Sequence, residues 1–249
     1  MTDQLHLHRI LLKDSLAVHR LGRDLGLPDY PFDPDYVMHC LLAELFGPGK
    51  VQPFVQDPRN RGHAILGYSF IDGDELQQMA QSVSSPEVYN LVDWRNSQSK
   101  RMPVSWRIGT RLGFRARVCP LVRGPSGHGR NESPVKKNKP EVDAYLARCW
   151  RDQEPPGRET VYLEWLTREV SRDGAAHVET ASMEGFRLKR ALRRGRDRKA
   201  KAITRPDALL KGVLRIMDTQ AFTNLLARGL GRHRGFGFGM LLLTAEGRQ

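Results

Sequence analysis

The chain has 249 residues, a formal net charge of +12 at pH 7 and a sequence pI of about 10.0. This charge predicts a polyanionic partner, nucleic acid first and an anionic membrane surface second, with a simple solubility role as the alternative. Cys40, Cys119 and Cys149 form no C-x-x-C pair, which argues against a zinc ribbon or a disulfide framework, so we expect no metal and no cofactor. Without a signal peptide or a long apolar run, the chain is expected to be a soluble, cytoplasmic protein with no membrane partner.

The first half of the chain alternates between strand and helix patterns. In chain order, the expected elements are strand 5–12, helix 35–47, strands 51–56 and 63–70, helix 73–83 and a strand within 102–123. Residues 13–34 begin with a helical pattern that glycine and prolines break. The helix over 35–47 has an apolar stripe and is expected to be capped by Asp33 or Asp35. The order β-α-β-β-α-β is that of a ferredoxin-like unit, as in RNA-recognition domains.

The second half follows a polar, glycine- and proline-containing segment at 124–141, which predicts a linker. The expected elements are helices 142–150 and 159–174, strands 175–190 and 203–216, helix 218–231 and strand 236–246. The similar order predicts an α+β protein with two related halves in tandem. We expect domains at 1–122 and 159–249, joined by a linker and short helix at 123–158.

A glycine-rich loop, "GLGRHRGFGFG", spans residues 229–239. Glycines let a backbone approach a ligand closely, and the cations beside them favour a phosphate. The loop follows a helix and precedes a strand, which is the reverse of a dinucleotide-binding loop, and it has no Gly-Lys-Ser/Thr for a Walker loop. The alternative is a tight turn. The residues predicted here to bind RNA are Gly231, Arg232, His233, Arg234 and Gly237.

A dense basic run, "RLKRALRRGRDRKAK", spans residues 187–201 and contains a single acid, Asp197. It lies between two predicted strands, so we expect a basic hairpin that contacts an RNA or DNA backbone. A solvated basic face is the alternative. The predicted contacts are Arg187, Lys189, Arg190, Arg193, Arg194, Arg196, Arg198, Lys199 and Lys201.

Two clusters near the start of the chain are candidates for catalysis. Tyr36 and His39 are three residues apart on the predicted helix and share a face, so the tyrosine can assist a histidine that moves a proton. A packed or surface histidine is the common alternative. His19, Arg20 and Arg23 can bind phosphate or stabilise the charge that develops in phosphoryl transfer, or can be ordinary charges of a surface helix.

These motifs together resemble the CRISPR repeat-cleaving endoribonucleases. That family ends in a loop of pattern G-h-G, five residues with at least one base, then G-h-G, where h is hydrophobic, and residues 229–239 fit it at every position. The type I-E branch, called CasE, carries a Tyr-x-x-His element, which Tyr36 to His39 matches. The strand segment "LGFRARVCPLVR" also resembles a strand of that branch. The segment Lys13–Pro34 is longer than is usual there, so the type IV counterpart stays open.

The resemblance implies two tandem ferredoxin-like domains with a C-terminal glycine-rich loop and a metal-independent reaction on precursor CRISPR RNA. The ribose 2′-hydroxyl would attack the adjacent phosphorus, giving 2′,3′-cyclic phosphate and 5′-hydroxyl ends. His39 would act as base or acid, Tyr36 would assist it, and Arg23 could share the catalysis. The implied partners are the repeat stem-loop and the subunits of an effector complex. A non-catalytic RNA-binding subunit and a ribosomal or tRNA-binding protein are the alternatives.

Overall fold

The computed structural model describes residues 4–14, 21–24, 33–57, 59, 63–124, 140–194 and 200–245, without the side chains of 191–194 and 200–202. Its first sheet has the strand order β2-β3-β1-β4, with all neighbouring strands antiparallel. The elements of this unit are β1 (His6–Leu11), α2 (Pro34–Phe46), β2 (Phe54–Gln56), β3 (Ala64–Ser69), α3 (Gly73–Val83), α4 (Pro86–Tyr89) and β4 (Gln98–Arg101). The order is that of a ferredoxin-like unit and confirms the element order expected for the first half.

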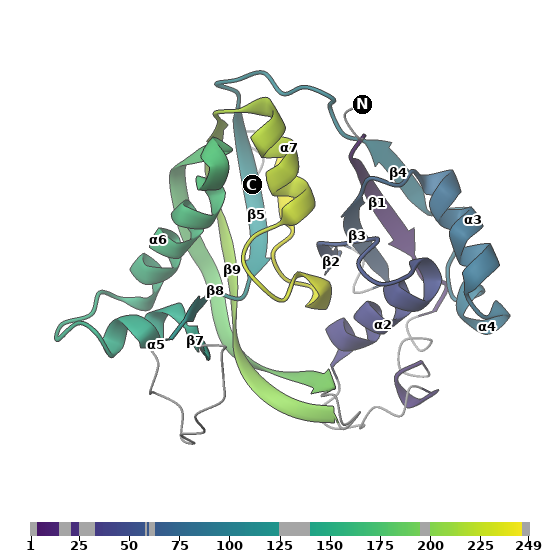
Figure 1. Cartoon of the computed structure of the whole chain (residues 1–249), viewed down its shortest axis with the longest axis horizontal. Coiled ribbons are helices and arrows are strands. Elements are labelled where there is room, and N and C mark those ends of the chain that lie inside the picture. Colours follow the sequence, from purple (N-terminus) through teal and green to yellow (C-terminus); the bar gives the residue numbers. More distant parts are fainter. Residues whose placement is uncertain are drawn as a thin grey trace.

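The second sheet repeats this arrangement with the order β10-β5-β9-β8. Its elements are β5 (Arg111–Val118), α6 (Arg158–Val170), β8 (Ala176–Arg194), β9 (Ala200–Ile216), α7 (Thr219–Arg228) and β10 (Leu241–Thr244). A small sheet of β6 (Leu121–Arg123) and β7 (Glu141–Asp143), then α5 (Ala144–Cys149), connects β5 to α6. Both units are therefore β-α-β-β-α-β, and they lie beside each other in Figure 1. The tandem ferredoxin-like fold predicted from the sequence is confirmed.

One strand was assigned to the wrong sheet. The strand expected within 102–123 to complete the first unit is β5, and it pairs with β9 and β10 of the second sheet. The first unit is completed by β4, whose residues Gln98–Arg101 are all polar and exposed. Such an edge strand has no apolar alternation to reveal it. The division of the chain into domains at residue 122 stays a prediction, and strand pairing favours a division between β4 and β5.

The two strands β8 and β9 form a hairpin that is much longer than the sheet it belongs to. Their pairing runs from Ala176 opposite Ile216 to Arg194 opposite Ala200. In Figure 1 this hairpin curves away from the sheet and passes below α2 of the first unit. The described residues of the basic run, 187–194 and 200–201, therefore lie toward the far end of a hairpin.

Each unit has its own hydrophobic core, and the two cores meet. One cluster is centred on α2, with Val37, Met38 and Leu45 fully buried. The other lies between the second sheet and helices α6 and α7. Tyr68 of β3 belongs to the second cluster and donates a hydrogen bond across to the Leu241 carbonyl at 3.1 Å. No helix in the described ranges is long and apolar enough to cross a membrane.

Candidate functional site

Helix α2 presents Tyr36 and His39 toward the glycine-rich loop. The ring of Phe236 stacks on Tyr36 at 6.0 Å between centroids and lies 4.6 Å from the His39 ring. Tyr36 is only 7% exposed, whereas His39 is half-buried. Burial lowers the pKa of His39 below its ordinary value, and a hydrogen bond with the Gly235 backbone partly opposes that shift. His39 is therefore uncharged at neutral pH, the state in which an imidazole can accept a proton.

The glycines of the loop mainly serve its own folding. Gly229, Gly231, Gly237 and Gly239 all have positive φ angles, which disfavour other residues. A Cβ atom at Gly231 would lie 2.5 Å from Cζ2 of the buried Trp165, and one at Gly237 would lie 2.9 Å from Oδ1 of Asp35. These glycines therefore let the loop pack closely against α6 and α2.

The expectation that the backbone at Gly231 and Gly237 approaches a ligand needs correction. The Gly231 N–H donates to Oε2 of Glu169 at 3.2 Å, and the Gly239 N–H donates to the Arg117 carbonyl at 2.7 Å. Gly237 is buried behind Asp35. The part of the loop that faces outward is its basic centre, since Arg232 is exposed while its neighbours His233 and Arg234 are half-buried.

A cleft of about 510 Å³ brings this basic centre together with the Tyr–His pair. It is open to solvent and is lined by residues of α2, the glycine-rich loop, β7 and β9. The polar and aromatic side chains that line it are Tyr36, His39, Gln52, Glu141, Arg205, Arg232, His233, Arg234, Phe236 and Phe238. Side chains from distant parts of the chain thus form one site with a histidine and several cations.

The acid in this cleft, Glu141, is surrounded by basic side chains. Its Oε1 lies 2.7 Å from Nη1 of Arg232, and its Oε2 lies 3.1 Å from Nη2 of Arg205 and 3.2 Å from Nε2 of His233. Burial alone would raise the pKa of Glu141, but the Arg232 hydrogen bond and the nearby cations outweigh it and lower the pKa. Glu141 is therefore ionised, and it balances part of the positive charge.

A buried ion cluster holds α2 against the second sheet. Arg117 of β5 binds both carboxylate oxygens of Asp207 at 2.8 Å, and its Nη1 binds Oδ2 of Asp35 at 2.8 Å. The Lys189 ammonium binds Asp33 at 2.7 Å and also contacts Asp35. Charge-assisted, bidentate contacts of this kind fix geometry strongly. The cluster positions the helix that carries Tyr36 and His39.

This cluster changes the role expected of two predicted RNA contacts. Lys189 is only 12% exposed and lies between two carboxylates, so it is a structural residue rather than a phosphate ligand. Asp33 was a predicted helix cap, but its side chain makes no cap hydrogen bond and accepts from Lys189 instead. Arg187 binds Asp207 through Nε yet stays 70% exposed, so it remains able to meet a second anion.

The other predicted residues divide into three groups. Arg190 and Arg23 are exposed, and Arg23 does not line the cleft. The hairpin strands contain Arg193, Arg194 and Lys201, for which the structure describes the backbone but not the side chains. The residues that lie wholly outside the described part of the chain are His19, Arg20, Arg196, Arg198 and Lys199. The roles of all these residues stay predictions.

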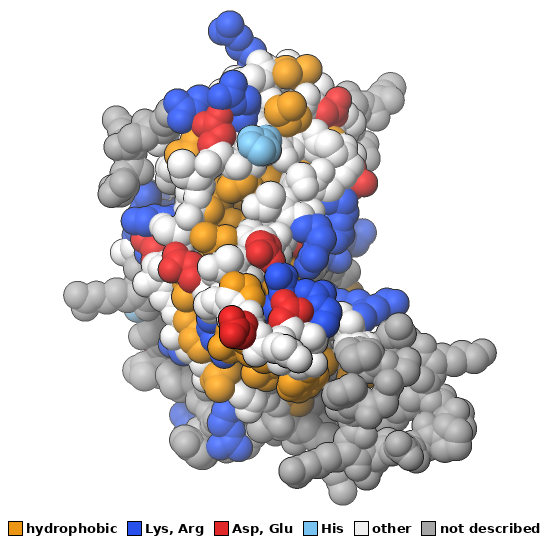
Figure 2. Space-filling view, turned by 90° about the vertical axis from the view of Figure 1, so that its left-hand side faces the viewer, with side chains coloured by type: hydrophobic (Ala, Val, Ile, Leu, Met, Phe, Trp, Pro, Cys, Tyr) orange, Lys and Arg blue, Asp and Glu red, His pale blue; other side chains and the backbone are white. Residues whose placement is uncertain are grey.

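Sequence reasoning missed Glu141 and Arg205 of the cleft and Arg117 of the buried cluster. Arg117 stood out only as one of several arginines that alternate with apolar residues on a strand. Many other arginines of the second sheet are paired: Arg111 binds Glu179 at 2.6 Å, and Arg115 binds Glu184 at 2.6 Å. Acidic and basic side chains also lie next to each other on the face seen in Figure 2. The number of basic side chains therefore overstates how many of them are unpaired, although pairing leaves the net charge of +12 unchanged.

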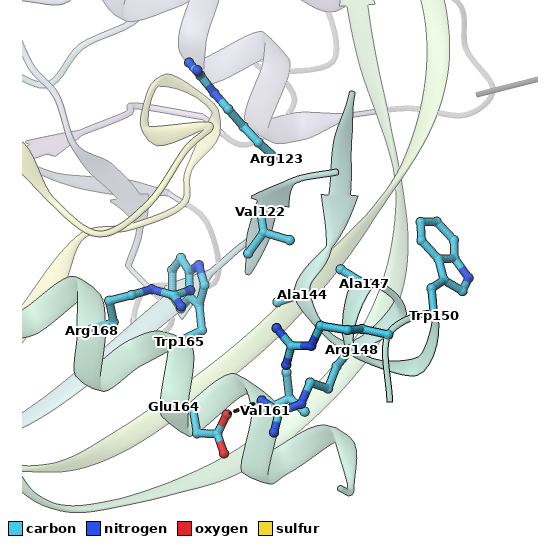
Figure 3. A pocket seen from close by; sticks show the side chains of 11 residues that line it. Val122, Arg123, Ala144, Ala147, Arg148, Trp150, Val161, Glu164, Trp165 and Arg168 are labelled. Carbon is cyan, nitrogen blue, oxygen red and sulfur yellow. Dashed lines mark hydrogen bonds and ion pairs between the residues drawn. The ribbon is translucent and has the colours of Figure 1, made fainter. Parts of the chain in front are cut away.

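A second cavity, of about 480 Å³, lies beside α5, α6 and β6 and is lined by none of the predicted site residues. Figure 3 shows Arg148 and Glu164 joined across it, with Arg123, Arg168 and Trp150 around the rim. Nη1 of Arg148 lies 3.0 Å from Oε2 of Glu164.

Two ferredoxin-like units that share a basic, histidine-containing cleft define a protein of the RNA-recognition-like fold class. A family model described as "CRISPR associated protein" matches residues 6–245, nearly the whole chain. The chain belongs to this family of CRISPR-associated proteins. No curated protein sequence gives a significant match.

Several solved structures of CRISPR-associated proteins have a similar fold. The CRISPR endoribonuclease Cse3 bound to a 19-nucleotide RNA superposes with a TM-score of 0.64 at 18% identity, over 97% of this chain and 99% of that one. Cas6e from Escherichia coli K-12 superposes with a TM-score of 0.57 at 23% identity, over 96% of this chain and 99% of that one. A chain of a CRISPR RNA-guided surveillance complex in a pre-nicking state superposes with a TM-score of 0.58 at 16% identity, over 96% of this chain and 99% of that one. At these identities the similarity establishes the fold.

Proposed function

We propose that this protein is a CRISPR RNA-processing endoribonuclease that binds the stem-loop of repeat RNA and cleaves the precursor without a metal ion. The observation that carries the proposal is that His39 and Tyr36 line one cleft with Arg205, Arg232, His233 and Arg234. A proton-transfer group thus lies beside cations that suit a phosphate. The similar proteins named an endoribonuclease and a part of a surveillance complex agree with this activity.

In this reaction His39 removes the proton of the ribose 2′-hydroxyl, and the oxygen attacks the adjacent phosphorus. The bond from phosphorus to the 5′ oxygen of the next nucleotide breaks, and this departing oxygen takes up a proton from water, which leaves a 2′,3′-cyclic phosphate and a 5′-hydroxyl. The lowered pKa of His39 keeps the imidazole in the basic form. Tyr36, whose ring centroid is 6.0 Å from that of His39, positions the imidazole together with Phe236.

The rest of the RNA lies along the basic hairpin in this proposal. Strands β8 and β9 extend past α2, and the basic run is at their far end. A-form RNA presents phosphates and shape more readily than base edges, so a basic hairpin suits a stem. Arg187 and Arg190 are the exposed described cations of this run, and the cations of the cleft then hold the strand near the cut. The product stays bound for an effector complex.

The test is cleavage of end-labelled repeat stem-loop RNA by the purified chain in EDTA. We expect cleavage by the wild type, none with a 2′-deoxy nucleotide at the cut, and a loss of about 100-fold or more for His39→Ala. Arg23→Ala is the comparison for His39→Ala, because Arg23 was the other candidate for catalysis and does not line the cleft. If Arg23→Ala abolishes cleavage and His39→Ala does not, the site assignment is wrong. Tight binding without any cleavage would leave a non-catalytic RNA-binding subunit.

A further inference from the structure

We propose that Arg205, Arg232 and His233 form a phosphate-binding subsite for the RNA, and that the carboxylate of Glu141 occupies this subsite as an internal anion until RNA displaces it. The inference rests on the proposed function for the identity of the ligand. It adds a defined subsite and an exchange between an internal acid and an RNA phosphate.

The geometry around Glu141 is that of an anion site. Both carboxylate oxygens accept hydrogen bonds, and the three donors come from β9 and the glycine-rich loop, more than sixty residues away in sequence. Guanidinium groups bind carboxylates and phosphates through the same planar donor pattern. A site that holds a carboxylate between two arginines and a histidine is therefore equally suited to a phosphodiester.

The carboxylate of Glu141 does not satisfy every donor around it. Within the described chain, Nε of Arg205 is buried and has no hydrogen-bond partner, although its Nη2 binds Glu141. Buried donors in native proteins normally have partners, so this nitrogen indicates a missing acceptor. A phosphodiester group has more acceptor lone pairs than a carboxylate and can engage both nitrogens of Arg205.

The position of the subsite also fits. Glu141, Arg205, Arg232 and His233 all line the cleft that contains His39, and that cleft is open to solvent. Arg232 is 42% exposed at its side chain, so an incoming strand can reach it before Glu141 leaves. The exchange of one anion for another keeps Arg205, Arg232 and His233 next to an anion throughout. In this exchange RNA competes with Glu141, which is covalently part of the site. The competition weakens the binding of any ligand that offers only one phosphate.

Removal of the charge of Glu141 tests the exchange. We expect Glu141→Gln to bind an uncleavable 2′-deoxy stem-loop several-fold more tightly than the wild type, and Glu141→Gln with Arg205→Ala to lose that gain. The matched control is Glu164→Gln, which removes an acid paired with Arg148 at 3.0 Å outside the cleft. Its affinity for the same RNA should stay at the wild-type value. Equal or weaker binding by Glu141→Gln would overturn the inference.

A second readout needs no RNA. Inorganic sulfate should raise the melting temperature of Glu141→Gln by more than that of the wild type or of Glu164→Gln, because the subsite no longer holds a carboxylate charge and binds the anion in the folded state only. Equal sulfate protection of all three proteins would overturn the inference even if RNA is cleaved normally. Conversely, a protein that fails to cleave RNA in EDTA but shows the sulfate and affinity effects would contradict the proposed catalysis and leave the subsite intact.

Discussion

Arg117 of β5 and Asp35 of α2 form an ion pair of 2.8 Å that joins the two ferredoxin-like units directly behind the Tyr–His pair. The carboxylate is almost completely buried, and Arg117 is also held by Asp207 and lies 4.5 Å from the centroid of the Phe238 ring. Burial alone would raise the pKa of Asp35, but Arg117 and Lys189 outweigh it and lower the pKa. One pair therefore connects α2, the second sheet and the glycine-rich loop.

Replacing Arg117 by methionine should strongly destabilise the protein. The change leaves Asp35 and Asp207 buried with less compensating charge, and breaking a buried ion pair on one side costs about 3–5 kcal/mol. We expect a loss of this size in the free energy of unfolding measured with urea. The control is Arg115→Met on the same strand, whose exposed pair with Glu184 contributes about 1 kcal/mol or less. Equal losses for both variants would contradict a special role for Arg117.

Gly231→Ala should cost more stability than Gly109→Ala. Both glycines have positive φ angles, 65° and 84°, so both variants incur the backbone penalty of about 1–2 kcal/mol for an L-residue. Only at Gly231 would the new Cβ meet a buried ring, 2.5 Å from Trp165, whereas nothing lies within 4 Å of one at Gly109. Urea unfolding of the two variants measures the difference. A smaller loss for Gly231→Ala would mean that the loop moves away without cost.

Stability should fall in mild acid because of His8. The His8 ring is buried and contacts the Ile71 carbonyl at 3.0 Å, and burial lowers its pKa from 6.5 to about 4. Between these two values the unfolded chain binds more protons than the folded one, so the free energy of unfolding falls as pH falls from 6.5 toward 4 and is fully retained above 6.5. The full shift corresponds to roughly 3 kcal/mol.

Urea unfolding at pH 7 and pH 4.5 measures this dependence, with His8→Gln as the comparison. Glutamine keeps a donor for Ile71 and does not titrate, so the variant should lose distinctly less stability between the two pH values. His6, which stacks on His8 at 5.9 Å, and Asp72, which favours protonation of both rings, remain in the variant. Parallel pH curves for the two proteins would show that His8 does not carry the effect.

The rate of RNA cleavage should depend on the protonation of His39. Burial lowers the pKa of His39, so the basic form is lost only below its ordinary value of 6.5. If His39 is the base, single-turnover cleavage in EDTA rises with pH through an inflection below 6.5 and is then constant up to pH 8. A rate that falls as pH rises through this range would identify His39 as the acid instead.

Local sequence patterns were sufficient to predict most elements and the tandem fold. Asp218, the first residue of the helix expected over 218–231, caps α7 by accepting from the Ala221 N–H at 2.7 Å, the role that aspartate favours at a helix start. The glycine-rich loop and the Tyr-x-x-His helix were found because both are short, continuous motifs. The strand at residues 5–12 was also predicted, but not the burial of His6 and His8, which lie under the helices of the first unit.

The sequence by itself determined most of the elements, the basic character and the two motifs, because each of these depends on neighbours along the chain. Only the tertiary structure decided which sheet β5 joins, since strand alternation is the same whichever partner a strand pairs with. It also decided which cations are neutralised: Lys189 pairs with Asp33 and Asp35 from more than 150 residues away. Contacts over such separations leave no periodic signal, so the ion cluster and the Glu141 subsite became visible only in the folded chain.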